Sequence, residues 1–201
     1  MHPTLRYAAL GDSYTIGTSV GEADRWPNQL VARLPGGTLE LVANLGVNGY
    51  TSDDLIGREL PALGGFLPGF VTVLIGVNDV VRRVPRDRYS ANVDYILDRL
   101  LAVLPANRIV VVSTPDYTLT PSGAAFGDPA QQSAAIGEFN EVERAVVAAR
   151  GICFVDIGTV ARRVAGDPAL VADDGLHPSG KQYRGWVDLV APVVERLLGG
   201  R

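Results

Sequence analysis

The sequence predicts an α/β fold, a three-layer α/β/α sandwich whose middle layer is a five-stranded parallel sheet. Two observations predict it: five short apolar runs recur along the chain, and longer amphipathic segments separate them. Strands and helices that alternate in this way form parallel sheets with helices on both faces. The functional site of such a fold lies at the carboxyl ends of the strands, so we expect chemistry in the turns after the apolar runs.

The five apolar runs are expected to be buried strands, because each is short and ends in a polar or glycine-rich turn. In chain order they cover residues 7–10, 39–43, 71–75, 109–112 and 153–157. The amphipathic segments between and after them are expected to be helices. They cover residues 24–34, 54–63, 88–104, 130–150 and 180–198.

Local signals mark the starts of the last two helices. Asp128 and Pro129 supply an N-cap and a first-turn proline for the fourth helix. Ser179 and Gln182 have the spacing of a capping box at the start of the last helix. Pro192 lies inside this last helix and lacks a backbone donor, so we expect a kink there or a split into two pieces.

Length and composition exclude several classes of protein. With 201 residues, 47% of them hydrophobic, the chain is expected to form a single domain over residues 1–201. The net charge of −4 argues against nucleic acid and anionic membranes as partners. No run of about 20 apolar residues is present, so we expect no integral membrane segment. The sequence leaves the oligomeric state open.

The cysteine content and the N-terminus bear on localisation. Cys153 is the only cysteine, so an intrachain disulfide and a cysteine-based zinc cluster are excluded, which fits a reducing compartment. The N-terminus lacks the long apolar run and cleavage site of a signal peptide. We therefore expect a cytoplasmic protein, although a signal removed beforehand would leave no trace and keeps secretion open.

The two histidines locate the candidate base. His2 lies in a terminus that we expect to be frayed, so histidine chemistry falls on His177. A serine is a weak nucleophile until a base takes its proton, and the base needs a carboxylate to hold its tautomer. Ser13, in the turn after the first strand, and Asp174, three residues before His177, fit these roles. Asp173 is an alternative carboxylate.

Two further residues suit the stabilisation of an oxyanion. Gly49 allows its backbone N–H to approach a substrate closely, and Asn78 offers a neutral amide N–H. Both lie in turns that follow predicted strands. Either residue alone would more often just build a turn, so the hypothesis rests on their convergence with Ser13 and His177.

Four blocks in this order resemble the GDSL, or SGNH, serine esterases and lipases: Gly11-Asp12-Ser13, Gly49 within Asn48-Gly49-Tyr50-Thr51, Gly76-Val77-Asn78-Asp79, and Asp174-Gly175-Leu176-His177-Pro178. The resemblance covers residues 11–178. It implies a flavodoxin-like fold, ester hydrolysis without a cofactor or metal, and an oxyanion hole from the Ser13 N–H, the Gly49 N–H and the Asn78 side chain. Tyr14 stands where the family name implies leucine, and Tyr50 where many members have aspartate.

The resemblance leaves the substrate open. We expect a small-molecule acyl ester with a short or acetyl acyl group, while lysophospholipids and thioesters remain alternatives for the same mechanism. Segment 115–127 is a candidate lid or pocket wall. The arginines at positions 82, 83, 86 and 88 indicate a solvent-exposed helix start, and they leave an anionic substrate as an alternative. The candidate pocket residues are Tyr14, Tyr50, Val77, Val80, Tyr117 and Phe126.

Two hypotheses from other classes compete with the serine esterase. The first is a metal-dependent phosphohydrolase, because carboxylates and a histidine at the strand ends are hard ligands for a divalent ion. Its candidate ligands are Asp12, Asp79, Asp173 and His177. The second is a binding module without catalysis; the presence of Ser13, Asp174 and His177 together argues against it.

Overall fold

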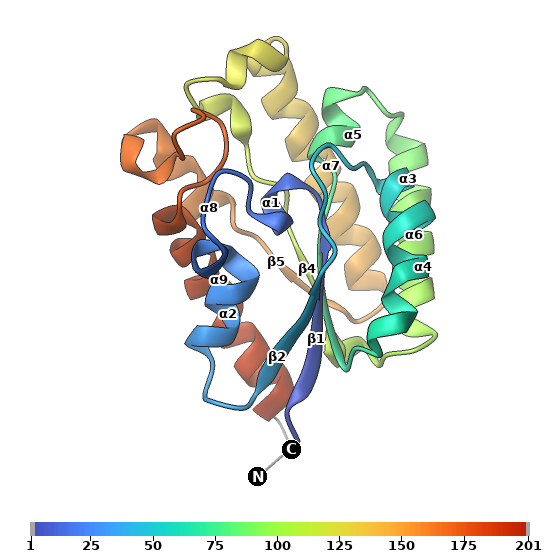
Figure 1. Cartoon of the computed structure of the whole chain (residues 1–201). Helices are drawn as coiled ribbons and strands as arrows, with labels where there is room; N and C mark the ends of the chain where they lie inside the picture. Colours follow the sequence, from blue (N-terminus) through green and yellow to red (C-terminus); the bar gives the residue numbers. More distant parts are fainter. Residues whose placement is uncertain (1–2, 200–201) are drawn as a thin grey trace.

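The computed structural model describes residues 3–199, so His2 and the outermost ends of the expected domain 1–201 lie outside the described residues. Its centre is a five-stranded parallel sheet with the order β2-β1-β3-β4-β5 (Figure 1). This is the flavodoxin-like strand order, which confirms the predicted fold class. The strands are β1 (Leu5–Gly11), β2 (Leu39–Asn44), β3 (Phe70–Leu74), β4 (Ile109–Val112) and β5 (Cys153–Val155).

Helices cover both faces of the sheet (Figure 1). Helices α2 and α9 pack together on one face, and α6 and α7 pack together on the other. The α-helices are α1 (Ser13–Ile16), α2 (Trp26–Arg33), α3 (Ser52–Asp54), α4 (Leu60–Leu63), α5 (Val77–Val81), α6 (Arg86–Leu101), α7 (Pro129–Ala149), α8 (Gly158–Ala161) and α9 (Gly180–Gly199). Short 3₁₀ helices cover Glu22–Asp24, Gly64–Phe66, Ala106–Arg108, Tyr117–Leu119, Gly123–Phe126, Arg162–Ala165 and Pro168–Leu170.

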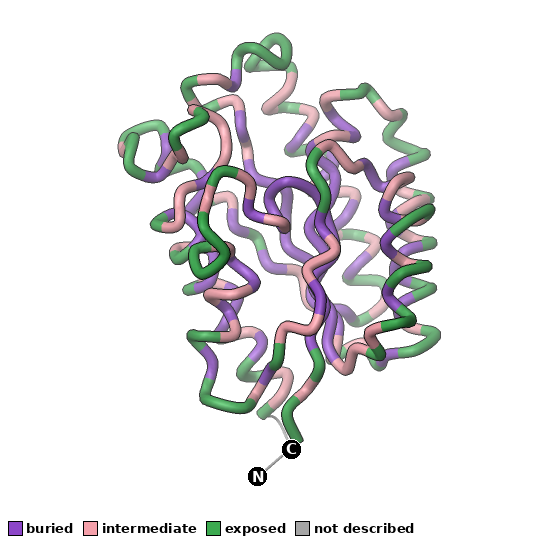
Figure 2. The backbone as a smooth tube through the Cα atoms, viewed as in Figure 1, coloured by how far each residue is buried: buried purple, intermediate pink, exposed green. Residues whose placement is uncertain are grey.

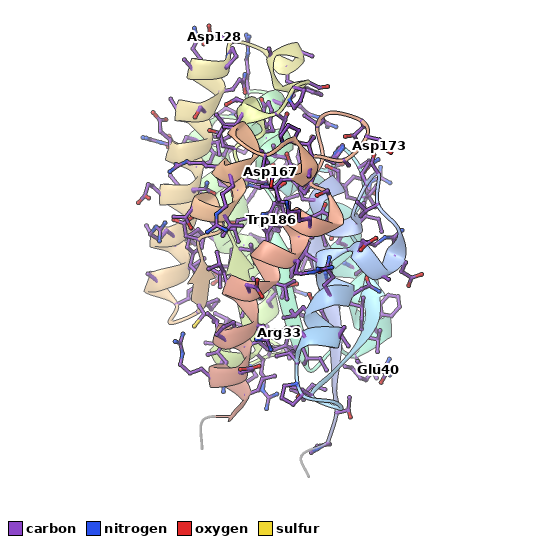
Figure 3. The ribbon with its side chains drawn as sticks, turned by 90° about the vertical axis from the view of Figure 1, so that its left-hand side faces the viewer. Arg33, Glu40, Asp128, Asp167, Asp173 and Trp186 are labelled. Carbon is purple, nitrogen blue, oxygen red and sulfur yellow. The ribbon has the colours of Figure 1, made fainter. Side chains whose placement is uncertain are left out.

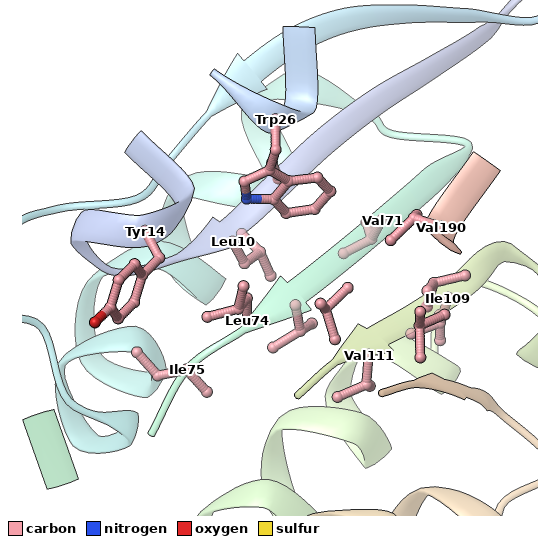
Figure 4. Packing of buried hydrophobic residues seen from close by; sticks show 14 of the residues in the cluster. Leu10, Tyr14, Trp26, Val71, Leu74, Ile75, Ile109, Val111 and Val190 are labelled. Atoms are coloured by element: carbon pink, nitrogen blue, oxygen red, sulfur yellow. The ribbon is translucent and has the colours of Figure 1, made fainter. Parts of the chain in front are cut away.

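The hydrophobic core lies on both faces of the sheet. All residues of β3 and β4 are buried, which is why these strands read as continuous apolar runs rather than as alternating patterns. Figure 2 shows the buried chain at the centre of the molecule and exposed residues along the outer helices. In Figure 4, Trp26 of α2 lies over Leu10, and Val190 of α9 lies beside Val71, so the two helices close one side of the core.

The predicted helix 54–63 is divided into three parts. Helix α3 starts with a capping box, in which the Thr51 hydroxyl accepts from the N–H of Asp54 and the Asp54 carboxylate accepts from the N–H of Thr51. A π-helical turn, Leu55–Glu59, follows, and α4 completes the segment. The N–H of Leu60 closes this wide turn by donating a hydrogen bond to the carbonyl oxygen of Leu55. Pro61 has no N–H to form the next regular bond, which favours this interruption.

For α9, the structure contradicts a split at Pro192 and a complete capping box. The helix is one element through Pro192, not two, because Val190, Ala191 and Val194 on both sides of the proline are fully buried. The capping box at its start is only half formed: the Ser179 hydroxyl accepts from the N–H of Gln182 at 3.3 Å, but the Gln182 amide donates to Ala161 instead of reaching back. The N-cap of α7 is formed as predicted, by Asp128 accepting from the N–H of Gln131.

Candidate active site

The candidate site lies between the ends of β1 and β3. In the order β2-β1-β3, the chain direction across the sheet reverses at this point, and the loops after the two strands separate to leave a crevice. Ser13 is the first residue of α1, directly after the loop that follows β1, and Asn78 is the second residue of α5, directly after the loop that follows β3. Helices α1 and α5, which begin in these loops, lie at the same end of the sheet in Figure 1.

The turn that presents Ser13 is tightly constrained. Gly11 has φ +148°, and a Cβ there would lie 2.1 Å from the carbonyl oxygen of Leu74 on β3, so only glycine fits. Asp12 caps α1 by accepting from the N–H of Tyr14 at 2.9 Å. Ser13 is therefore the first residue of the helix, where backbone N–H groups have no partner within the helix. Its N–H therefore has no partner within α1.

His177 and Asp174 form a compact pair in the loop before α9. The Nδ1 of His177 lies 2.6 Å from Oδ2 of Asp174. The other oxygen, Oδ1, accepts from the backbone N–H groups of Leu176 and His177, both at 2.9 Å. Gly175 has φ +74°, which allows this tight turn.

The charge state of Asp174 fixes the imidazole tautomer. The Ser19 hydroxyl donates to Oδ2 at 2.6 Å. Burial of the carboxyl alone would raise its pKa, but the hydrogen bonds from Ser19, from two backbone N–H groups and from the imidazole hold the pKa of Asp174 well below its usual range. An ionised carboxylate only accepts, so the proton of a neutral His177 lies on Nδ1 and leaves Nε2 free to accept another.

The loop after β2 and helix α5 hold the two candidate oxyanion donors. Gly49 has φ +80°, and its carbonyl oxygen accepts from the Arg82 guanidinium at 2.7 Å. The Nδ2 of Asn78 donates to the carbonyl oxygen of Tyr50 at 2.9 Å, which uses one of its two N–H groups. Within residues 3–199, the second N–H of Asn78 has no hydrogen-bond partner.

Most of the predicted site residues surround one cavity of about 210 Å³. Its polar wall comprises Ser13, Asn48, Gly49, Asn78 and His177. Its apolar wall comprises Tyr14, Val77, Val81, Tyr117, Phe126 and Leu176. A larger groove of about 590 Å³ lies between α4 and α6, but its only charged lining residue is Arg99, so it offers no comparable chemistry.

Two of the expected pocket residues do not line this cavity. Val80 is buried in the core, and its neighbour Val81 takes the place at the cavity wall. The ring of Tyr50 lies near the Arg58 guanidinium, 5.9 Å from its centroid. The expected lid segment contributes Tyr117 and Phe126, whose rings meet edge to face at 5.7 Å. It contains two 3₁₀ helices rather than an irregular loop.

Three buried carboxyls, Asp12, Glu59 and Asp79, lie in the segments that carry Ser13, Gly49 and Asn78 but do not line the cavity. Burial raises the pKa of Asp12 to about 8, of Glu59 to about 9 and of Asp79 to about 6, although hydrogen bonds to each oppose the shift. Asp79 accepts from both the N–H and the hydroxyl of Ser52, which joins the loops after β2 and β3. Glu59 accepts from the N–H of Gly11 at 2.8 Å.

The residues of the metal-dependent alternative do not meet. Asp12 and Asp79 are fully buried, whereas Asp173 is exposed at the surface (Figure 3). Within residues 3–199, no group of three or more histidine, cysteine, aspartate or glutamate side chains is placed to hold a metal ion. The geometry therefore gives this alternative no support.

Sequence reasoning missed Glu59 and Ser19. Glu59 had a signal, because it interrupts an apolar stripe with a spacing of four residues, Leu55-Glu59-Leu63. Ser19 had none, since its contact with Asp174 joins residues 155 positions apart. Its φ of +66° becomes visible only in the fold.

A profile of the GDSL-like lipase/acylhydrolase family matches residues 9–184. The chain belongs to this family. This GDSL-family protein is a carboxylic ester hydrolase. The matched segment contains all the predicted catalytic and oxyanion residues, from Ser13 to His177. No match was found among the curated proteins.

Solved structures similar to this GDSL-family protein share its fold. An acetylxylan esterase from Geobacillus stearothermophilus is 21% identical with a TM-score of 0.73, covering 99% of this chain and 96% of its own. An alpha/beta hydrolase from the metagenome of Lake Arreo is 22% identical with a TM-score of 0.71, covering 99% and 97%. A G-D-S-L family protein from Veillonella parvula is 16% identical with a TM-score of 0.76, covering 95% and 98%.

Two further structures of the Geobacillus esterase are of catalytic mutants, one with a serine and the other with a histidine replaced by alanine. Among the described residues of the GDSL-family protein, no helix has the length and apolar character needed to cross a membrane.

Proposed function

We propose that the protein hydrolyses carboxylic esters through a Ser13-His177-Asp174 triad and an acyl-enzyme intermediate. The observation that carries the proposal is the cavity itself: Ser13 and His177 share its wall with Gly49 and Asn78, and Asp174 is bonded to the far side of the imidazole. The catalytic serine and histidine replaced in the Geobacillus esterase agree with these roles.

In the first half of the reaction, Nε2 of His177 takes the proton of the Ser13 hydroxyl, and Oγ attacks the ester carbonyl carbon. The carbonyl oxygen becomes an oxyanion, stabilised by the Ser13 N–H, the Gly49 N–H and the free N–H of Asn78. The C–O bond to the alcohol then breaks, and the imidazolium returns its proton to the leaving alcohol. The acyl group remains on Ser13.

In the second half, His177 takes a proton from water, and the hydroxide attacks the acyl carbon. The Ser13–acyl bond breaks, Oγ regains the proton from the imidazolium, and the acid leaves. Asp174 remains ionised throughout and stabilises the imidazolium, which its low pKa permits. Among the described residues, Ser13 and His177 share no hydrogen bond, so we expect substrate binding to bring Oγ to Nε2.

The cavity favours a short acyl group. An apolar cavity of about 150 Å³ accommodates a benzene ring, so a cavity of about 210 Å³ holds an acyl chain of similar carbon number but not a long fatty acid. The side chains beyond the catalytic groups are aromatic or aliphatic. Thioesters and lysophospholipids with short acyl groups remain compatible with the same mechanism.

A series of p-nitrophenyl esters from acetyl to palmitoyl tests the size of the acyl group. We expect kcat/KM to rise up to about six carbons, since each buried methylene contributes about 0.8 kcal/mol, and to fall beyond that length. The Val81→Phe variant places a larger side chain in the cavity wall and reduces the volume of the cavity. Its highest kcat/KM should therefore occur at a shorter acyl chain. Val103→Phe, at an exposed position two residues after the end of α6, is the control and should leave the optimum unchanged. A maximum at palmitoyl in the unaltered protein would contradict the proposal.

Replacing Asn78 by alanine tests the oxyanion hole. We expect kcat to fall by about 10²–10³-fold with little change in KM, because the hydrogen bond from the Asn78 side-chain amide to the oxyanion strengthens in the transition state. Asn107→Ala, an exposed position before β4 at the opposite end of the sheet, should retain full activity. A change confined to KM would instead place Asn78 in substrate binding.

A further inference from the structure

Glu59 contacts the turn that presents Ser13, residues 11–13, from another element of the fold. This turn is called the nucleophile turn. It ends the π-helical turn that follows the Gly49 loop, and it is 2% exposed. Its Oε2 accepts from the N–H of Gly11 at 2.8 Å, while the carbonyl oxygen of Gly11 accepts from the N–H of Val47 at 3.2 Å. Both backbone groups of Gly11 are therefore held by the segment that carries Gly49.

Gly11 is the residue through which this contact can act on Ser13. It lies two positions before the serine, with a backbone conformation that only glycine adopts readily. A rotation at Gly11 would move the Ser13 hydroxyl and the Ser13 N–H together, which are the proposed nucleophile and one oxyanion donor. Misplacement of a reacting group by about 1 Å can cost about 10²-fold in rate.

The environment of Glu59 disfavours a charged carboxylate. Within the described residues its Oε1 is buried without a hydrogen-bond partner, and so is Oδ2 of Asp12. Burial raises the pKa of Glu59, and the charges of Asp12 and Asp54 add to the shift. A charged carboxylate at this position would lack a compensating cation, since Arg58 and Arg82 pair with the half-buried Asp54 instead.

We propose that Glu59 is a positioning residue, whose buried carboxyl fixes the nucleophile turn by accepting from the N–H of Gly11. The proposal rests on Ser13 being the nucleophile. The helical segment that starts at the N-cap Thr51 and reaches Glu59 directly follows the Gly49 loop. The hydrogen bond from Gly11 to Glu59 therefore connects the nucleophile turn to this loop.

Three substitutions test this role. Glu59→Gln keeps a neutral carbonyl acceptor, so we expect kcat within about twofold of the unaltered enzyme. Glu59→Asp withdraws the acceptor by one methylene, and Glu59→Met removes it. Both should lower kcat by tenfold or more with KM unchanged, and the rate of fluorophosphonate labelling of folded protein should fall in parallel. If the Glu59→Met variant does not fold, the comparison of Glu59→Gln with Glu59→Asp tests the role.

Glu143 provides the matched control. It is also a buried carboxyl whose Oε2 has no partner within the described residues, but it lies on α7, and its side-chain partner is Tyr89 of α6 rather than the nucleophile turn. Glu143→Met should lower the melting temperature and leave kcat of the folded protein unchanged. Full kcat in Glu59→Asp or Glu59→Met, or a loss in Glu59→Gln equal to theirs, would overturn the proposal. A Ser13→Ala variant that retains turnover would instead overturn the proposed function.

Discussion

Replacing Asp174 by asparagine is expected to lower kcat about 10⁴-fold without unfolding the protein. The asparagine carbonyl can still accept from the N–H groups of Leu176 and His177, so the loop keeps its shape. Its amide N–H₂, however, would face Nδ1 of His177 as a donor. The imidazole proton then moves to Nε2, where it prevents the ring from accepting the proton of Ser13.

The neighbouring Asp173 is the control for this substitution. It is exposed (Figure 3), and within residues 3–199 it makes no hydrogen bond to His177. Asp173→Asn changes the net charge by the same amount and should leave kcat unchanged within about twofold. If Asp173→Asn lost activity and Asp174→Asn retained it, the carboxylate of the triad would be Asp173.

Replacing Ser13 by alanine is expected to lower kcat by about 10⁶-fold, as for the nucleophile of other serine hydrolases. The attacking oxygen is lost, while the Ser13 backbone N–H, Gly49 and Asn78 still stabilise an oxyanion. A residual rate of about 10³–10⁴ over water is therefore expected. The assay is hydrolysis of a short p-nitrophenyl ester, with circular dichroism to show that the fold is intact.

Ser90→Ala on α6 controls for the loss of a serine hydroxyl. Ser90 does not line the cavity, so turnover should be unchanged. Turnover of Ser13→Ala close to that of the unaltered protein would exclude an acyl-enzyme on Ser13.

The fold could be predicted because its strands are short apolar runs with polar ends. All five strands lie where the runs predict them, and β5 is shorter by two residues. It ends at Val155 because Asp156 accepts from the N–H of Gly158 and turns the chain away from the sheet. The parallel order then brings the turns with Ser13 and Asn78 together, which explains how residues 65 positions apart reach one cavity.

The finer structure of the site depends on backbone conformations that the hydrophobic pattern of the sequence does not predict. Val80 and Val81 are neighbouring residues of the same type, so the sequence does not distinguish them. The rotation of α5 about its axis, which depends on its start at Gly76 with φ +137°, decides which one faces the cavity. The inward direction of Glu59 depends on the π-helical turn. The contact of Ser19 with Asp174 depends on packing between distant loops.

The central claim is that Ser13 is the nucleophile of an acyl-enzyme mechanism, and covalent labelling tests it most directly. The protein would be treated with a fluorophosphonate, digested, and the modified residue located by mass spectrometry. We predict one adduct on the Ser13 hydroxyl, loss of activity in proportion to labelling, and no adduct in Ser13→Ala. An adduct on another residue, or full activity with Ser13 modified, would contradict the claim.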